Sequence, residues 1–223
     1  MYLLLHGALG SKSQLDPVKK ALSDQGRAVE SMNFSGHSGE PFSDAGFGIE
    51  TFADDIDRFL TKENVTEPVD IFGYSMGGYV ALWFAHLHPN KVGRIITLGT
   101  KLDWDPASAR REVGKLNPDL MLEKVPAFAR LLERRHTPND WREVIARTAQ
   151  MMQTLGDSPL LTEDILASIP HEVEIWLGDR DDMADRAYSQ RVADLLPKGT
   201  FRLLPDTPHP VEKLRVIPFA TTR

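Results

Sequence analysis

The sequence predicts an α/β protein with a mostly parallel central sheet of about six strands, helices on both faces and an inserted helical cap. Short apolar runs alternate along the chain with segments of helical spacing, which is the pattern of a parallel sheet with crossover helices. The first of these runs does not alternate polar with apolar residues, as is typical of strands buried on both faces. Between residues 100 and 170 no strand candidate occurs, and this stretch is longer than a strand-to-helix connection needs.

The strand candidates are the apolar runs at residues 2–5, 28–32, 69–72, 92–98, 172–177 and 200–204. The helix candidates between them lie at residues 16–26, 49–60, 76–85 and 185–196. Each of these helical segments has apolar residues at the spacing of one helix face, so each is expected to pack on the sheet.

Two units follow from this pattern: a core formed by residues 1–100 and 171–223, and a helical cap formed by residues 101–170. Glycine and proline divide the cap into several helices. Most of its apolar residues are expected to pack against one another. A subset is expected to line a substrate pocket with Tyr74, and the candidates are Trp104, Met121, Phe128, Trp141 and Met152.

The motif Gly73-x-Ser75-x-Gly77 stands between a strand candidate and a helix candidate. A strand that turns directly into a helix leaves one residue at the apex in a strained conformation, with its side chain exposed. The flanking glycines remove the Cβ atoms that would clash in so tight a turn. The helix that begins near Met76 directs its free N–H groups toward the apex. We therefore predict Ser75 as a catalytic nucleophile.

The composition excludes several classes of function. The chain has 223 residues and a net charge of −6 without a basic block, which argues against nucleic acid as the main partner. Cysteine is absent, which excludes a thiolate metal site and a cysteine nucleophile. No apolar run approaches the length that spans a membrane, and the first residues lack the features of a signal peptide. We expect a cytoplasmic protein with no membrane partner.

A serine nucleophile needs a base to take its proton and an acid to orient that base. In a parallel sheet such groups belong on loops at the carboxyl ends of strands. His209 follows the last strand candidate between two prolines that stiffen the loop, so we predict it as the base. Asp181 follows the preceding strand and is predicted as the acid. The competing carboxylates are Asp179, Asp182 and Asp185.

The loop His-Gly-Ala-Leu-Gly at residues 6–10 follows the first strand candidate. Its glycines allow backbone N–H groups to turn inward. Together with the N–H of Met76, the N–H of Ala8 or Leu9 would form a two-donor oxyanion hole. The ring of His6 is expected to brace this loop and not to touch substrate.

These motifs resemble the α/β-hydrolase fold superfamily, in which nucleophile, acid and base follow one another as Ser75, Asp181 and His209 do here. The resemblance covers nearly the whole chain and is specific for the fold and the triad. The two strands that usually precede the His-Gly strand are missing, and the C-terminal tail is short.

The resemblance implies a serine hydrolase that acts on a small ester-like substrate, a small-molecule partner, without a cofactor. No metal site is expected, because the only close histidine pair, His86-x-His88, lies at a helix end where cationic side chains are favoured. The oligomeric state is left open, a homo-oligomer included.

Three alternatives stay open. The motifs at residues 6–11 and 73–78 also resemble the menaquinone-pathway synthase that eliminates pyruvate, although Tyr79 stands where that enzyme would carry arginine. Arginines for an anionic substrate are available in the cap, at Arg130, Arg134 and Arg135. A carbon–carbon bond hydrolase using the same triad is a second alternative. A non-catalytic ligand-binding scaffold is the third, because the fold does not by itself fix the function.

Overall fold

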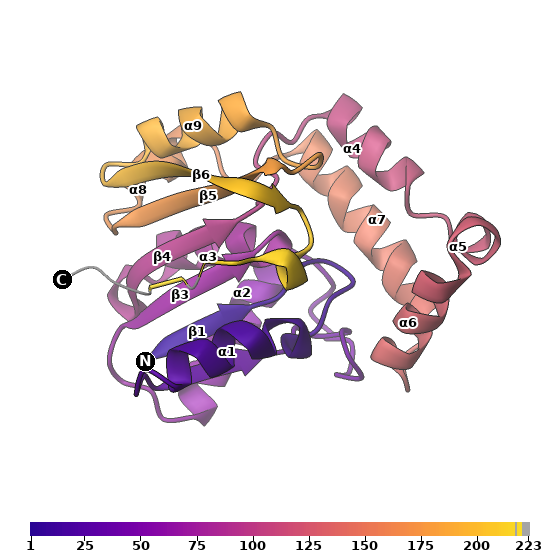
Figure 1. The fold of residues 1–223 in the computed structure, drawn as a ribbon, viewed down its shortest axis with the longest axis horizontal. Helices are drawn as coiled ribbons and strands as arrows, with labels where there is room; N and C mark the ends of the chain where they lie inside the picture. The colour runs from indigo at the N-terminus through magenta and orange to yellow at the C-terminus, as the bar shows by residue number, and fades with distance from the viewer. Residues whose placement is uncertain (217, 220–223) are drawn as a thin grey trace.

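The computed structural model describes residues 1–216 and 218–219 (Figure 1). A single six-stranded sheet has the order β2-β1-β3-β4-β5-β6, and every neighbouring pair is parallel. The strands are β1 (Tyr2–Leu5), β2 (Val29–Met32), β3 (Val69–Tyr74), β4 (Val92–Leu98), β5 (Val173–Arg180) and β6 (Gly199–Pro208). The predicted fold class is confirmed, and each predicted strand is present.

Helices connect and flank these strands. The α-helices are α1 (Asp16–Ser23), α2 (Ile49–Lys62), α3 (Met76–Leu87), α4 (Pro106–Gly114), α5 (Pro118–Lys124), α6 (Pro126–His136), α7 (Trp141–Asp157), α8 (Glu163–Ser168) and α9 (Arg186–Leu195). Short 3-10 turns lie at Lys12–Leu15, Pro89–Lys91 and Val211–Lys213.

The sheet buries a separate apolar core on each face. Alternate strand residues point to opposite faces, so Leu3 and Leu5 of β1 belong to one core while Tyr2 and Leu4 belong to the other. Helices α2, α3, α8 and α9 cover the first face, and α1 packs on the second. This two-sided burial explains why the β1 sequence is apolar throughout.

Helices α4 to α7 stand beyond the carboxyl ends of β5 and β6 (Figure 1). Proline occupies the first position of α4, α5 and α6, where a missing N–H costs nothing, so the prolines start these helices. Helices α4 and α7 approach closely at Gly156, where a Cβ atom would meet Asp105 O at 2.9 Å. Helix α8 lies apart from them, against α3 and α9.

Strands β5 and β6 run further than their apolar sequences indicate. After Gly178 the register shifts, and Arg180 then pairs with Pro208. Polar residues, glycine and proline form this extension, so no hydrophobic pattern marks it. As a result, Asp181 and His209 each follow directly after the end of a strand, on neighbouring strands of the sheet.

The structure offers no helix with the length and apolar character needed to cross a bilayer within the residues it describes.

Candidate active site

Ser75 lies at the turn between β3 and α3 with a φ of 51° and a ψ of −119°. Residues other than glycine rarely adopt these backbone angles, and such strain in a native structure points to a functional constraint. Two hydrogen bonds hold the turn: Ser75 N donates to Leu98 O at 2.8 Å, and Thr100 Oγ1 donates to Ser75 O at 3.0 Å. The strained turn is therefore anchored to β4 and the residues that follow it.

The glycines around Ser75 are required by close backbone contacts. A Cβ atom on Gly73 would lie 2.5 Å from Gly77 O, and one on Gly77 would lie 2.5 Å from Leu5 O. Atoms at these separations overlap, so a larger residue would force β3, α3 and β1 apart. The Gly-x-Ser-x-Gly spacing thus has a steric cause in this chain.

Asp181 and His209 form a hydrogen-bonded pair. His209 Nδ1 and Asp181 Oδ2 are 2.8 Å apart, and the two side chains are 12% and 2% exposed. The other carboxylate oxygen of Asp181 accepts from the N–H groups of Met183 at 2.9 Å and Ala184 at 3.2 Å. An ionised Asp181 accepts a hydrogen bond from the N–H at His209 Nδ1, which leaves Nε2 of the neutral ring free to accept a proton.

The competing carboxylates have other partners. Asp185 accepts a hydrogen bond from Tyr188 N at 2.7 Å and so is the N-terminal cap of α9. Asp179 accepts from Thr207 N at 3.2 Å, while Asp182 is exposed. Of the four acidic residues in this stretch, Asp181 is the one whose carboxylate contacts His209.

The loop after β1 is braced by His6. Its Nδ1 donates to Gly7 O at 2.8 Å, and its Nε2 accepts from Phe34 N at 3.2 Å. The side chain is fully buried, and this burial lowers the pKa of His6 to about 4, against an ordinary 6.5. A neutral ring with one donor and one acceptor thus joins two loops at the edge of the site.

Three backbone N–H groups near Ser75 are candidates for an oxyanion hole. Met76 is the first residue of α3, so its N–H has no acceptor within the helix. The N–H groups of Ala8 and Leu9 also have no acceptor within the described part of the chain. Leu9 is held at a φ of 56°, and its carbonyl accepts from Arg135 at 2.7 Å and His136 at 3.2 Å.

A cavity of about 590 Å³ contains both Ser75 and His209. The other predicted site residues on its wall are Ala8, Leu9, Tyr74, Met121, Phe128 and Met152. A narrower, mostly apolar hollow of about 40 Å³ adjoins Ser75 and is lined by Trp104, Met76 and Met152 among others. Ser75 therefore lies where the two hollows meet, and helices from the predicted cap form part of both walls.

Trp141, the remaining predicted pocket residue, lines neither hollow. It is the first residue of α7, is 8% exposed and belongs to a cluster with Leu132, Val144 and Ile145. Its ring packs inside the helical segment, because the spacing that marks an apolar helix face does not tell the buried side from the pocket side.

Several lining residues escaped prediction. Met183 contributes to both hollows, and its backbone N–H donates a hydrogen bond to Asp181. Its place two residues after the predicted acid was the signal in the sequence that could have identified it. Arg135 and Glu212 line the larger cavity. Both lie in charged stretches that also suit a solvated surface. The sequence therefore offers Arg135 only as one of three cap arginines for an anionic substrate, and it does not mark Glu212.

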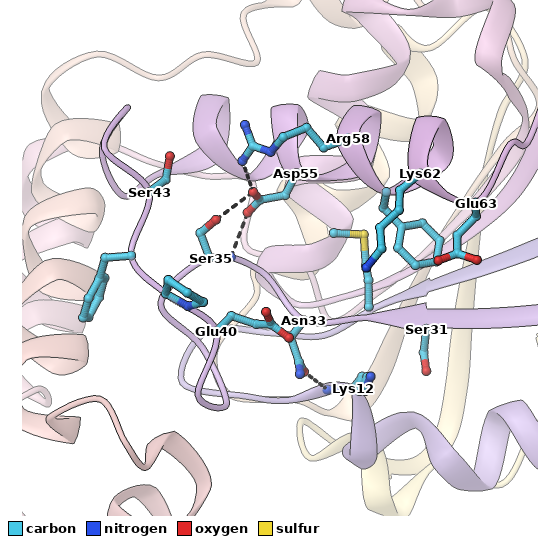
Figure 2. Close-up of a pocket in the computed structure, with 14 residues that line it drawn as sticks. Lys12, Ser31, Asn33, Ser35, Glu40, Ser43, Asp55, Arg58, Lys62 and Glu63 are labelled. Atoms are coloured by element: carbon cyan, nitrogen blue, oxygen red, sulfur yellow. Dashed lines mark hydrogen bonds and ion pairs between the residues drawn. The ribbon is translucent and has the colours of Figure 1, made fainter.

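A second hollow of similar size, about 510 Å³, lies beside β2 and α2, and neither Ser75 nor His209 contributes to its wall (Figure 2). Some of its polar groups are paired with one another. Asp55 accepts from Ser35 N at 2.8 Å and Ser35 Oγ at 2.7 Å, and it pairs with Arg58. Lys12 N donates to Asn33 at 2.8 Å. The residues that suit acyl chemistry lie in the other cavity.

The described part of the chain contains no cluster of three or more His, Cys, Asp or Glu side chains that could hold a metal ion. The groups that meet around Ser75 are a hydroxyl, an imidazole paired with a carboxylate, and free backbone N–H groups. This arrangement suits nucleophilic attack on an acyl carbon.

Comparison with known proteins gives partial sequence matches and broad structural ones. The chain is 32% identical over 97 residues to sn-1-specific diacylglycerol lipase ABHD11 of Danio rerio, covering 43% of this chain and 30% of that protein. It is 34% identical over 89 residues to pimeloyl-[acyl-carrier protein] methyl ester esterase of Neisseria meningitidis, covering 40% and 32%. The matched stretches thus span about a third of these relatives' length.

Among solved structures, an esterase from Thermogutta terrifontis superposes with a TM-score of 0.72 at 20% identity, covering 95% of this chain and 84% of that one. At this identity the likeness concerns the fold. The family model described as alpha/beta hydrolase fold matches residues 3–211. The match spans nearly the whole chain and includes each of the motifs described above, so the chain belongs to the α/β hydrolase fold family.

Proposed function

We propose that the protein is a serine hydrolase that transfers the acyl group of a small ester-like substrate to water. Ser75 is the nucleophile, His209 the general base and acid, and Asp181 the residue that orients His209. The oxyanion hole consists of the N–H of Met76 and that of Ala8 or Leu9. The pocket is formed by the core loops and by α4 to α7, which act as a cap over the site.

The reaction has two halves. Ser75 Oγ attacks the acyl carbon while its proton passes to His209 Nε2, and the buried carboxylate of Asp181 stabilises the imidazolium. The free N–H groups stabilise the oxyanion of the tetrahedral intermediate. His209 then protonates the leaving group, and an acyl-serine remains. Water repeats the same steps in the second half and regenerates the free hydroxyl.

One observation carries this proposal. His209, which is hydrogen-bonded to Asp181 at 2.8 Å, lies in the same cavity wall as a serine held in a strained turn. A core that needed only packing would not bury a carboxylate against an imidazole and strain the neighbouring serine. No hydrogen bond joins Ser75 Oγ to His209 in this structure, and such contacts often tighten only when substrate binds.

The relatives support an ester substrate, because a lipase and a methyl ester esterase are among them. Many of the residues that line the larger cavity are apolar, which suits an acyl chain. No specific observation favours the carbon–carbon bond enzymes. Tyr79, at the position where the menaquinone-pathway enzyme would carry arginine, is 2% exposed, and its hydroxyl accepts from Leu161 N at 3.0 Å.

The test is steady-state turnover of p-nitrophenyl esters of increasing chain length by the wild type and Ser75→Ala. We expect turnover by the wild type and its loss in the variant. A serine-directed fluorophosphonate provides the second readout and should label the wild type at Ser75 alone.

Three results would separate the alternatives. Turnover that survives in Ser75→Ala would contradict the assigned nucleophile. Labelling without turnover of any ester would indicate a competent serine with a different natural reaction, such as carbon–carbon bond cleavage. Absence of both label and turnover would indicate a ligand-binding scaffold.

A further inference from the structure

Arg135 lines the cavity that contains Ser75 and His209, although it belongs to a helix rich in surface charge. Its neighbour Arg134 is exposed and does not contribute to the cavity. The side chain of Arg135 is half-buried, and this burial lowers the pKa of its guanidinium. An arginine keeps its charge in proteins even so, because its ordinary pKa lies above 12.

The guanidinium uses little of its hydrogen-bonding capacity within the protein. One bond, from Nη1 to Leu9 O at 2.7 Å, is present. Among the described residues no carboxylate lies within ion-pair distance of Arg135. A guanidinium has five N–H donors in a planar fork, so most of those on Arg135 have no partner among the residues that the structure describes.

The rest of the cavity explains why this charge matters. The apolar residues that share its wall include Leu9, Met121, Val125, Phe128, Leu131 and Met152. Lys115 and Glu212 also line the cavity, and each has a partner other than Arg135. Lys115 pairs with Glu112 at 2.8 Å, and Glu212 accepts from Gln14 at 2.9 Å. Arg135 is thus a cation with no ion pair among the described residues, in a mostly apolar cavity where the nearby charge of Glu212 only partly offsets the effect of burial on its pKa.

We propose that Arg135 binds an anionic group of the substrate, a carboxylate or a phosphate, while Ser75 attacks the ester. The planar fork of arginine matches both groups in a two-bond geometry, and the apolar surroundings strengthen the contact. The substrate class is therefore an ester that carries a negative charge away from the reacting carbon. This inference rests on the proposed function, because it places the charge in the cavity of Ser75.

Glu212 is the one carboxylate that shares the cavity wall with Arg135. Its negative charge opposes a bound anion. Its carboxylate accepts from Gln14 and makes no ion pair with Arg135, although its charge is near enough to raise the pKa of the guanidinium. Removing this charge by Glu212→Gln should increase the preference for an anionic substrate. Glu212→Gln and a variant that removes the charge of Arg135 should therefore change the preference for a charged ester in opposite directions.

The experiment compares matched ester pairs by kcat/KM. In the first series of pairs, the acyl chain ends either in a carboxylate or in a methyl group. Mono-p-nitrophenyl esters of the diacids from glutarate to suberate are compared with neutral p-nitrophenyl esters of equal chain length. In the second series the charge is on the leaving group, as in 4-carboxyphenyl against phenyl hexanoate. The preference is the charged-to-neutral ratio within one variant, so general damage to the active site cancels.

We expect Arg135→Gln to lower this preference by roughly tenfold to a hundredfold in one of the two series, as for loss of hydrogen bonds to a charged group. Arg135→Lys keeps the charge without the fork and should fall between the two. Arg134→Gln removes an equal charge from the adjacent exposed position and is the matched control. Its preference should equal that of the wild type.

A preference that is the same in Arg135→Gln and the wild type in both series would overturn the proposal. So would an equal loss in Arg134→Gln, because the effect would then be long-range charge. Inhibition of neutral ester turnover by free glutarate, or by inorganic phosphate, distinguishes the two anions. If Ser75→Ala keeps full neutral ester turnover, the proposed function fails, whatever the result for Arg135.

Discussion

Asp181 and Asp182 are adjacent carboxylates that differ in what surrounds them. Asp181 contacts His209 and is buried, whereas Asp182 is exposed. Asp181→Asn should lower kcat for the best ester by roughly 10³–10⁴-fold, because asparagine leaves the imidazole in the wrong tautomer. Asp182→Asn should leave kcat near that of the wild type. The reverse order would show that the acid is Asp182.

Gly99 is a second residue on which the Asp181–His209 pair depends. Its φ is +59°, and a Cβ atom there would lie 2.8 Å from Asp181 Oδ2 and 3.1 Å from His209 Nδ1. Gly99→Ala should therefore lower both kcat and the free energy of unfolding, the latter by about 1–3 kcal/mol.

Gly114 supplies the matched control for that glycine. It ends α4, and a Cβ atom there would meet nothing within 4 Å. Gly114→Ala should stabilise the protein by up to about 1 kcal/mol, because alanine favours the helix. Urea unfolding at pH 7.5 measures both variants. Equal stability of Gly99→Ala and the wild type would show that β4 relaxes around the new methyl group.

The residues that could be predicted are those whose type and place are both unusual. Ser75 stands between two glycines at a strand-to-helix boundary, and His209 stands between two prolines after a strand. Arg135 could be named only as one of three cap arginines, because an arginine in a basic stretch of helix has the same pattern whether it faces water or a cavity. Trp141 illustrates the converse, since its pattern suited a pocket while its ring packs inside the helical segment.

At the scale of elements, helix α6 is tied to the loop that we propose as part of the oxyanion hole. His136 accepts from Ser38 N at 3.1 Å through Nδ1, so its Nε2 carries the proton and donates to Leu9 O at 3.2 Å. One ring thus joins α6 to the loops after β1 and β2. We expect the position of the Ala8 and Leu9 N–H groups to depend on this contact.

His136→Phe should lower kcat/KM for neutral esters about tenfold, because phenylalanine fills the space without a donor for Leu9 O. His136→Gln retains an N–H donor and should recover part of the loss. Both variants are compared by kcat/KM and by urea unfolding. A loss of activity that merely follows the loss of stability, with no recovery in His136→Gln, would contradict a role in placing the loop.

Element boundaries could be predicted where the sequence contains a stop or start signal. The prolines at 106, 118 and 126 begin helices, and β1 and β4 have the predicted bounds. The extensions of β5 to Arg180 and of β6 to Pro208 could not be predicted. Their residues are polar, glycine or proline, and their pairing depends on a register shift that only the neighbouring strand determines.

At the scale of the whole molecule, the parallel direction of the strands could be inferred from the alternation of strands and helices. The arrangement of buried histidines could not. His6, His37 and His136 come from three separate segments and are fully buried. The ring centres of His6 and His37 are 5.1 Å apart, and those of His37 and His136 are 5.8 Å apart. The three histidines are far apart in the sequence, so only the tertiary fold shows that they lie together.

This histidine cluster should make stability depend on acidity. Burial lowers the pKa of His6 and of His136 to about 4 and that of His37 well below 6.5, and charge on the neighbouring histidines lowers that of His37 further. The unfolded chain therefore binds more protons than the folded protein as pH falls from 6.5 toward 4. The cluster's contribution is fully present above pH 6.5 and is lost on acidification, by up to about 1.4 kcal/mol per pH unit for each histidine.

Urea unfolding at pH 7.5, 6.5, 5.5 and 4.5 measures this slope. We expect the free energy of unfolding to fall throughout the acidic range. His37→Asn retains an N–H donor for Ser35 O, which lies 3.2 Å from the ring nitrogen, and removes one titrating group, so its slope should be shallower by up to about 1.4 kcal/mol per pH unit. His88→Asn, at the end of α3 and outside the cluster, controls for replacing a histidine elsewhere. If the slopes of wild type and His37→Asn coincide, His37 is not among the groups that couple folding of this molecule to acidity.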